Sequence, residues 1–305
     1  MQQTIDIDVA VVGGSSAGLA AALTLGRCGR KAVIFDTGRP RNKPAAHAQN
    51  LFTRDGTPPL ELLRIGREQL VPYPSVSIVE TAVTSAIAEN GLFILHTDTG
   101  AAYRAQRVIL ATGVKDDLPD IPGLAALWGS KLVHCPYCHG WEIKDLPVAV
   151  FANGPMAYEF TAVLTNWHPD IILCTNGPAG LTAEQMQQLA RNGITVTETP
   201  VEKVEETAGG MQISFADGTA VRRSAAYIKS GLIFNNTLAE QLGCELTEKG
   251  AVKINHVQET TVPGVFAAGD ISSEGAHQVS IAIAGGHMAA GMCNNGLAKA
   301  AFEQK

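Results

Sequence analysis

The chain has 305 residues, of which 46% are hydrophobic and 17% are charged, and it contains 31 glycines. This composition excludes a disordered or low-complexity chain, and the length suits two domains of about 100–200 residues each. The 23 basic and 29 acidic residues give a net charge of −6 without a basic stripe, so nucleic acid is not an expected partner. Residues 1–8 lack the basic start of a secretory signal, which favours a cytoplasmic protein without a membrane segment.

The first third of the chain predicts α/β structure. Hydrophobic periodicity predicts a strand over Ile7–Val12, a helix over Ala17–Gly26 and a strand over Lys31–Phe35, the order of a mononucleotide-binding unit. An amphipathic helix at 61–69 follows, and then strands at 76–87, 92–97 and 107–111 that alternate as in an antiparallel meander. The loop at 41–59 contains no recognisable sequence motif, and its His47 could face a cofactor or solvent.

The turn after the first strand matches a dinucleotide-binding fingerprint in part. Its three glycine positions hold Gly13, Ser15 and Gly18, and Ala17 opens the helix whose free N–H groups would face a pyrophosphate. Asp36 follows at the distance expected for an acceptor from the adenosine ribose. The hydroxymethyl group of Ser15 departs from the pattern, because it could bind a phosphate or hinder close approach of the backbone. A simple tight turn is the alternative interpretation.

The centre of the chain holds Cys135 and Cys138 in the segment HCPYCHGWE. Two intervening residues at a helix start allow a disulfide and lower a thiol pKa from about 8.5 toward 7. The pair therefore predicts redox chemistry, with His139 as the proton carrier, while His134 could serve packing or chemistry. Three alternatives stay open: c-type haem attachment, which needs export; structural zinc, which needs four ligands; and an inert pair. The other cysteines are expected to be buried thiols: Cys28, Cys174, Cys244 and Cys293.

A second β-α-β unit is predicted at 148–152, 156–167 and 171–175, which suggests an internal duplication. Its glycine positions hold Ala152, Gly154 and Ala157, so that a methyl group stands at the tight turn. The residues after its second strand, Cys174–Gly177, offer neither an acid for a ribose 2′-hydroxyl nor an arginine for a 2′-phosphate. The sequence therefore argues against tight NADPH binding.

Two later segments carry a family resemblance. VILATG at 108–113 and TVPGVFAAGD at 261–270, together with the first turn and the CxxC, resemble FAD-dependent disulfide reductases of the low-molecular-weight thioredoxin reductase type. Residues 261–270 are also expected to form a strand that ends in Gly-Asp. The resemblance implies an FAD site that includes Ala111, Thr112, Gly113, Gly269, Asp270, Gln278, Val279 and Ala282. Asp270 would hold the ribityl chain, and Cys138 would face the flavin while Cys135 exchanges with substrate. His277 stands where the family has arginine, and the uncharged segment 279–297 is expected to be a buried helix.

The resemblance implies an α/β fold with two Rossmann-like, three-layer ββα domains that pair as homodimers. An FAD domain would comprise residues 1–117 and 245–305, and residues 118–244 would form an NAD(P)-domain-like insert that carries the CxxC. The CPYCHGWE segment, with VVGGSSAGL near the start, looks like the dithiol oxidases of gliotoxin-, holomycin- and romidepsin-type natural products. We therefore expect oxidation of a dithiol, either a small molecule or a thioredoxin-like protein, through the cysteine pair and FAD with oxygen as acceptor. An NADPH-dependent thioredoxin-disulfide reductase and a non-catalytic flavin redox sensor are the alternatives.

Overall fold

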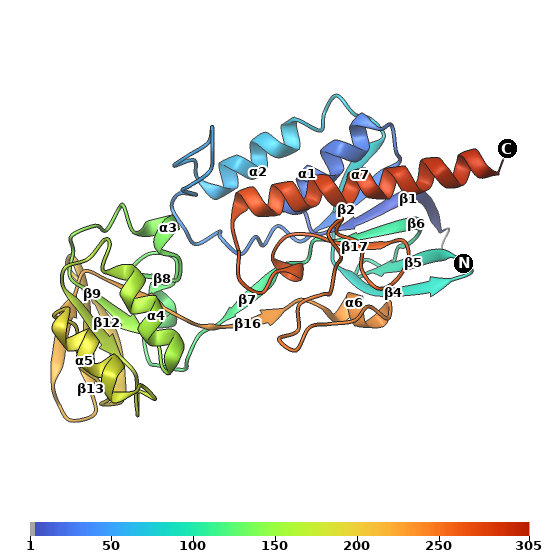
Figure 1. Cartoon of the computed structure of the whole chain (residues 1–305). Coiled ribbons are helices and arrows are strands. Elements are labelled where there is room, and N and C mark those ends of the chain that lie inside the picture. Colours follow the sequence, from blue (N-terminus) through green and yellow to red (C-terminus); the bar gives the residue numbers. More distant parts are fainter. Residues whose placement is uncertain (1–3, 305) are drawn as a thin grey trace.

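The computed structural model describes residues 4–304. It has two lobes, and the chain crosses between them along two strands, β7 (Val114–Asp117) and β16 (Gly231–Phe234) (Figure 1). These strands pair antiparallel, with Val114 opposite Phe234. The larger lobe is therefore built from two stretches of the chain, and the smaller lobe is an insertion between them.

A mixed sheet organises the larger lobe. Its strands are β1 (Ile5–Val12), β2 (Ala32–Asp36), β3 (Val76–Glu80), β4 (Val83–Glu89), β5 (Leu92–Thr97), β6 (Ala102–Leu110) and β17 (Val265–Ala267). The order is β3-β2-β1-β6-β5-β4, with β1, β2, β3 and β6 parallel and β4 to β6 antiparallel. The second half of β6 also pairs in parallel with β17.

Side-chain alternation along β1 divides the larger core into two layers. Val9 and Val11 face α1 (Ser16–Arg27) and α7 (Val279–Glu303), which cover one side of the sheet. Ala10 and Val12 face the other side, where the meander and α6 (Thr237–Gln241) complete the core. Helix α2 (Pro59–Glu68) packs beside α1. The arrangement places the carboxyl ends of the parallel strands toward the smaller lobe (Figure 1).

The smaller lobe repeats the three-layer plan. Its parallel sheet has the order β11-β10-β9-β15-β8, and an antiparallel sheet of β12, β13 and β14 covers one face. Helices α4 and α5 cover the other face. The bounds are β8 (Leu132–Val133), β9 (Val148–Phe151), α4 (Pro155–Leu164), β10 (Ile171–Cys174), α5 (Ala183–Arg191), β11 (Thr195–Thr197), β12 (Val201–Thr207), β13 (Gly210–Phe215), β14 (Ala220–Arg223) and β15 (Ala225–Ile228). The predicted α/β class with two Rossmann-like units is confirmed.

Four expectations from the sequence were wrong in detail. The predicted strand at 76–87 is two strands, and the first pairs in parallel with β2 instead of joining the meander. The predicted strand at 261–270 is shortened to β17, because a turn at Val262 precedes it. Cys28 is exposed, since it lies at the C-terminal end of α1. Helix α7 buries one face only, and Ile281, among others, is exposed.

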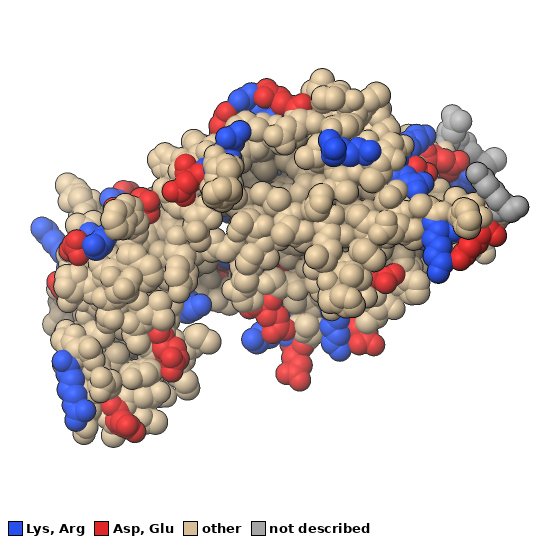
Figure 2. Space-filling view, turned by 45° about the horizontal axis from the view of Figure 1, so that its top comes forward, with Lys and Arg blue, Asp and Glu red and all other residues tan. Residues whose placement is uncertain are grey.

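The described residues on the face shown in Figure 2 form no concentration of one charge. Lys and Arg lie scattered among Asp and Glu on the face shown in Figure 2. Within residues 4–304, no helix is long and apolar enough to cross a membrane. The domain limits at 117 and 245 remain a proposal. Helix α6 packs into the core of the larger lobe, so the second crossing between the lobes lies at β16, before residue 245.

Candidate active site

The CxxC segment lies at the start of the short helix α3 (Pro136–His139). Cys135 is the N-cap residue with extended backbone, and Pro136 occupies the first helical position, where its missing N–H removes no hydrogen bond. The Cys138 N–H donates to the Cys135 carbonyl at 3.2 Å. The two sulfurs form a disulfide, with Cα atoms 5.3 Å apart. The helix start and the disulfide predicted from the spacing are therefore confirmed.

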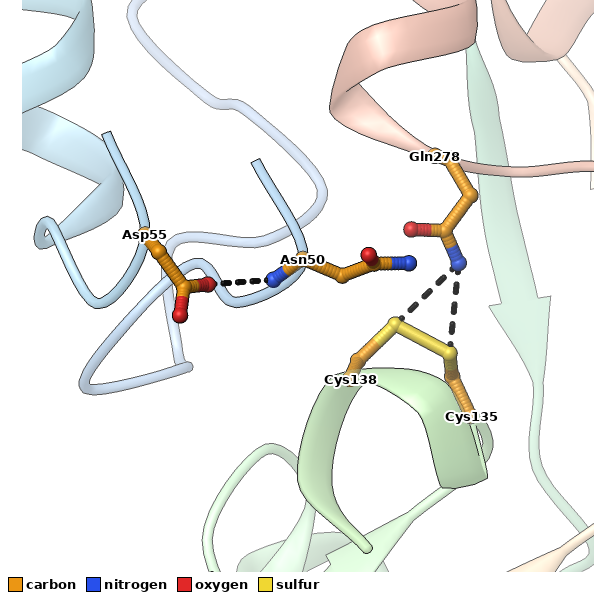
Figure 3. Close-up of a disulfide and its surroundings, with 5 residues drawn as sticks. All are labelled: Asn50, Asp55, Cys135, Cys138 and Gln278. Atoms are coloured by element: carbon orange, nitrogen blue, oxygen red, sulfur yellow. Dashed lines mark hydrogen bonds between the residues drawn. A yellow bond between two sulfur atoms is a disulfide. The ribbon is translucent and has the colours of Figure 1, made fainter. Parts of the chain in front are cut away.

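The disulfide faces Gln278, the N-cap residue of α7 in the larger lobe. The side-chain amide nitrogen of Gln278 lies 3.3 Å from each of the two sulfurs (Figure 3). Cys138 lines the cavity described below, whereas Cys135 is 8% exposed and does not line it. This placement suits the expected flavin-facing role of Cys138.

Two histidines flank the cysteine pair, and burial keeps both neutral at pH 7. Burial lowers the pKa of His139, against the opposing effects of the nearby Cys135 backbone and the charge of Glu142. The buried His139 Nδ1 has no hydrogen-bond partner in the described part of the chain. Burial and the nearby Arg41 lower the pKa of His134 to about 4, and its ring stacks on Trp128. The unpartnered nitrogen of His139 is consistent with a role as proton carrier, whereas the His134 ring packs against Trp128.

A cavity of about 740 Å³ extends from the β1–α1 turn to the disulfide, within the range of ordinary ligand pockets. All the predicted site residues except Gly18 and Cys135 line it. They are Gly13, Ser15, Ala17, Asp36, Ala111, Thr112, Gly113, Cys138, His139, Gly269, Asp270, Gln278, Val279 and Ala282. The fold thus brings together residues from both ends and the centre of the chain, and His47 lies on the same wall.

The glycines of the first turn are required by close backbone contacts. A Cβ at Gly13 would lie 2.2 Å from the Ala111 carbonyl oxygen, and a Cβ at Gly18 would lie 1.8 Å from the Gly13 carbonyl oxygen. Gly18 therefore serves helix packing and not the cavity wall, as the third fingerprint glycine does. Ser15 is the N-cap of α1, and its side chain makes no capping bond within the described residues. Its hydroxyl remains available to a ligand in the cavity.

Both predicted acidic residues are held in ion pairs. The Asp36 carboxylate accepts from Arg67 at 2.6 Å. Asp270 accepts from Arg41 at 3.2 Å, and Arg41 also donates to both oxygens of Asp116 at 2.5 and 2.8 Å. A carboxylate accepts several hydrogen bonds, so these pairs fix the positions of Asp36 and Asp270 and leave acceptor capacity for ribose or ribityl hydroxyls.

Comparison with known proteins assigns the family. The model of the pyridine nucleotide-disulphide oxidoreductases matches residues 7–286. The chain belongs to this family. Thioredoxin reductase tcpT of Claviceps purpurea (strain 20.1) is 33% identical to this oxidoreductase, over 95% of this chain and 94% of its own length.

Two crystal structures share the fold of this pyridine nucleotide-disulphide oxidoreductase at similar identity. HlmI matches with 33% identity and a TM-score of 0.93, over 100% of this chain and 97% of its own. The oxidoreductase from Agrobacterium tumefaciens matches with 34% identity and a TM-score of 0.90, over 96% and 99%. The low-molecular-weight thioredoxin reductase architecture is therefore confirmed, and the enzyme is a flavin-dependent thiol–disulfide oxidoreductase.

The cavity of this oxidoreductase fits FAD, the cofactor of its thioredoxin-reductase-like relatives. The glycine contacts let the turn lie against β6, and the N-terminus of α1 points its free N–H groups toward the cavity wall. The far end of the cavity reaches Cys138 and the unpartnered His139 nitrogen. A long dinucleotide could therefore contact the α1 turn at one end and the disulfide at the other.

Sequence reasoning missed several residues at this site. Arg41 and Asn50 lie in the loop at 41–59, and Asn50 points toward the disulfide (Figure 3). The Thr112 hydroxyl donates to the Asn235 carbonyl, and the Asn235 amide donates to the Thr112 carbonyl, both at 2.8 Å. Residues 123 apart in the chain are joined by this pair, so no local pattern could have shown it.

Proposed function

We propose that this enzyme oxidises dithiols to disulfides through Cys135 and Cys138, with FAD as its resident cofactor and oxygen as the final electron acceptor. The observation that carries the proposal is the geometry of the second β-α-β unit, where a reductase would bind NADPH. There the chain folds back onto its own nucleotide-binding turn.

Carbonyl groups in the segment after β10 accept hydrogen bonds from N–H groups of that turn. The Gly154 N–H donates to the Ala179 carbonyl at 2.9 Å. The Asn153 side-chain amide donates to the carbonyls of Thr175 at 3.0 Å and Pro178 at 2.8 Å. These N–H groups stand at the start of α4, where a dinucleotide would need them for its pyrophosphate.

The other groups near this turn also oppose a pyridine nucleotide. Pro155, the first residue of α4, has no N–H, and the Ala157 N–H donates to the Gly154 carbonyl. Glu198 accepts from the Ala179 N–H at 2.6 Å, which places a carboxylate beside the turn. Asn176 is held in the left-handed region, and its side chain accepts from Val201. The residues therefore do not fit NAD(P)H, and no step is assigned to it.

The cysteine pair can carry out the exchange with a substrate dithiol. A substrate thiolate attacks one sulfur, the disulfide bond breaks, and the other sulfur leaves as a thiolate. The second substrate thiolate then displaces the first cysteine, which releases a substrate disulfide and a reduced pair. His139 can accept a substrate proton, because its imidazole is neutral at pH 7. Bound FAD supplies the two-electron chemistry that links the reduced pair to oxygen.

We also propose individual roles at the cofactor. The turn at Gly13, Ser15 and Ala17 would hold the pyrophosphate, with Gly18 allowing the close packing behind it, and Asp36 would hold the adenosine ribose. Asp270, with Gly269, would bind the ribityl chain, and the start of α7 at Val279 and Ala282 would lie beside the isoalloxazine. Ala111, Thr112 and Gly113 would support it from the end of β6. The positions of these residues around one cavity support the assignment.

Oxygen consumption tests the proposed function. With an excess of a small dithiol and no pyridine nucleotide, we expect one O₂ consumed and one H₂O₂ formed for each dithiol oxidised, because each reaction moves two electrons. The names of relatives such as thioredoxin reductase tcpT favour the alternative, an NADPH-dependent reductase. Turnover that occurs only with NADPH and a thioredoxin disulfide would support that alternative and contradict oxidation by oxygen. A redox sensor would react once and stop.

The remaining proposals concern assembly, location and substrate. We propose a homodimer, which the exposed Ile281, Ile283 and Met288 on α7 support, and a molar mass in solution of twice 32.1 kDa would test it. We propose a cytoplasmic enzyme, which fractionation of cells would test. The substrate is a dithiol or disulfide, and we propose a small molecule or a thioredoxin-like protein, to be separated by comparing turnover of the two.

A further inference from the structure

The side chain of Gln278 contacts the disulfide and does not cap its own helix. Gln278 is the N-cap residue of α7, yet its side chain caps no described N–H of that helix. Its Nε2 lies 3.3 Å from the sulfurs of Cys135 and Cys138, which stand 143 and 140 residues earlier in the chain (Figure 3). A disulfide sulfur accepts weakly and has no proton to donate, so the amide N–H group is the consistent partner.

The strength of this contact depends on the redox state of the pair. A neutral disulfide sulfur is a weak acceptor, whereas a thiolate accepts a charge-assisted hydrogen bond that is about twice as strong as a neutral one. The donor is already in place before the disulfide opens. Because Nε2 is equally distant from both sulfurs, it can serve whichever sulfur becomes the thiolate.

We propose that Gln278 is a catalytic residue that stabilises the cysteine thiolate released when a substrate thiolate attacks the disulfide. In that step a bond forms between the substrate sulfur and one cysteine sulfur, and the disulfide bond breaks. The electron pair of the broken bond stays on the other cysteine sulfur, which accepts the hydrogen bond from Nε2. Stabilising the reduced pair makes the disulfide a stronger oxidant, so the inference rests on the proposed oxidation of dithiols and deepens it.

Other charged and titratable groups line the same cavity as Cys138. They come from the end of β2 and the loop after it, from β7, from the redox segment and from the residues before α7: Asp36, Arg39, Arg41, His47, Lys115, Asp116, His134, His139, Asp270 and His277. All of them remain in a Gln278 variant. A change in the cysteine pKa on substitution of Gln278 is therefore caused by loss of its amide group and not by these other groups.

The test compares Gln278→Leu and Gln278→Glu with the native protein. Leucine removes the donor, and an ionised glutamate places a negative charge beside the thiolate. Ser280→Ala, an exposed residue in the same helical turn, is the matched control. Two readouts on FAD-loaded protein require no turnover when oxygen is excluded: the pH dependence of iodoacetamide alkylation of the reduced pair, and the fraction of disulfide at equilibrium with dithiothreitol. Both are measured under anaerobic conditions by mass spectrometry.

For Gln278→Leu we expect a cysteine pKa about one unit higher, which is a tenfold lower thiolate fraction below that pKa. The dithiothreitol equilibrium should shift about tenfold toward the disulfide, equal to about 30 mV. Gln278→Glu should shift both further in the same direction, and Ser280→Ala should shift neither. Unchanged alkylation and equilibrium in both Gln278 variants would overturn the assignment. If the variants shift as expected but the native protein consumes no oxygen with dithiols, the assignment is supported and the proposed function is contradicted.

Discussion

Replacing Cys138 by serine is expected to lower dithiol-dependent turnover by about 10³-fold or more, the scale of loss seen when a covalent catalytic residue is removed. Serine cannot form the disulfide that the substrate must attack, and a hydroxyl does not ionise near neutral pH as a thiol does. Cys138 also lines the FAD cavity, so the variant loses the sulfur that faces the cofactor. The rate of oxygen uptake measures the effect.

The same substitution also tests the division of roles between the two cysteines. Mixed with a disulfide that has a coloured leaving thiol, the Cys138→Ser protein should retain a stable mixed disulfide on Cys135, detected by intact mass, because no second thiol remains to displace it. Cys28→Ser is the matched control, since Cys28 is exposed and does not line the cavity. Turnover of Cys138→Ser within about tenfold of the native rate would contradict the role of the pair.

Replacing Arg41 by methionine is expected to destabilise the protein by about 3 kcal/mol, the low end for breaking a buried ion pair. The Arg41 and Asp116 side chains are 17% and 5% exposed, and their contact is bidentate. Methionine keeps much of the side-chain volume but leaves the Asp116 carboxylate buried without its cation. Asp116 lies in the strand β7 that leads into the smaller lobe, and the loss should be measured by urea unfolding of the FAD-loaded protein.

A surface pair provides the control for this prediction. Arg104 and Asp6 also form an ion pair, at 2.6 Å, but their side chains are 47% and 64% exposed, and such pairs contribute about 0–1 kcal/mol. Arg104→Met should therefore change the unfolding free energy far less than Arg41→Met. Adding Asp116→Leu to Arg41→Met should restore part of the loss, because no buried charge is then left unpaired. Equal effects of Arg41→Met and Arg104→Met would show that burial of the pair contributes nothing.

The local parts of this structure could be predicted from the sequence. Apolar periodicity and glycine placement located β1, α1 and β2, and the CxxC spacing located the start of α3, because each depends on residues a few positions apart. The residues expected at the cofactor converge on one cavity, since the carboxyl ends of the parallel strands meet at one edge of the sheet.

Contacts between distant segments could not be predicted. Arg41 meets Asp116 and Asp270 only in the folded chain, and Gln278 was expected beside the cofactor but also contacts both sulfurs. The absence of charge in residues 279–297 suggested a fully buried helix, yet α7 covers a single sheet face, with Ala289 and Cys293 inside and Ile281 outside. The sequence indicated that the second nucleotide turn is degenerate. It did not indicate that N–H groups of Gly154 and Asn153 donate to carbonyls of the segment after β10.

The most direct test of the central claim is anaerobic reduction of the bound flavin, followed by its visible absorbance. NADPH, NADH and a small dithiol are added in separate samples of the FAD-loaded protein. We expect that only the dithiol bleaches the flavin within seconds, because N–H groups of Gly154 and Asn153 in the second nucleotide turn already donate to the chain's own carbonyls. Admission of air should then restore the colour with formation of H₂O₂. Rapid bleaching by NADPH would contradict this account and establish a nucleotide-dependent reductase.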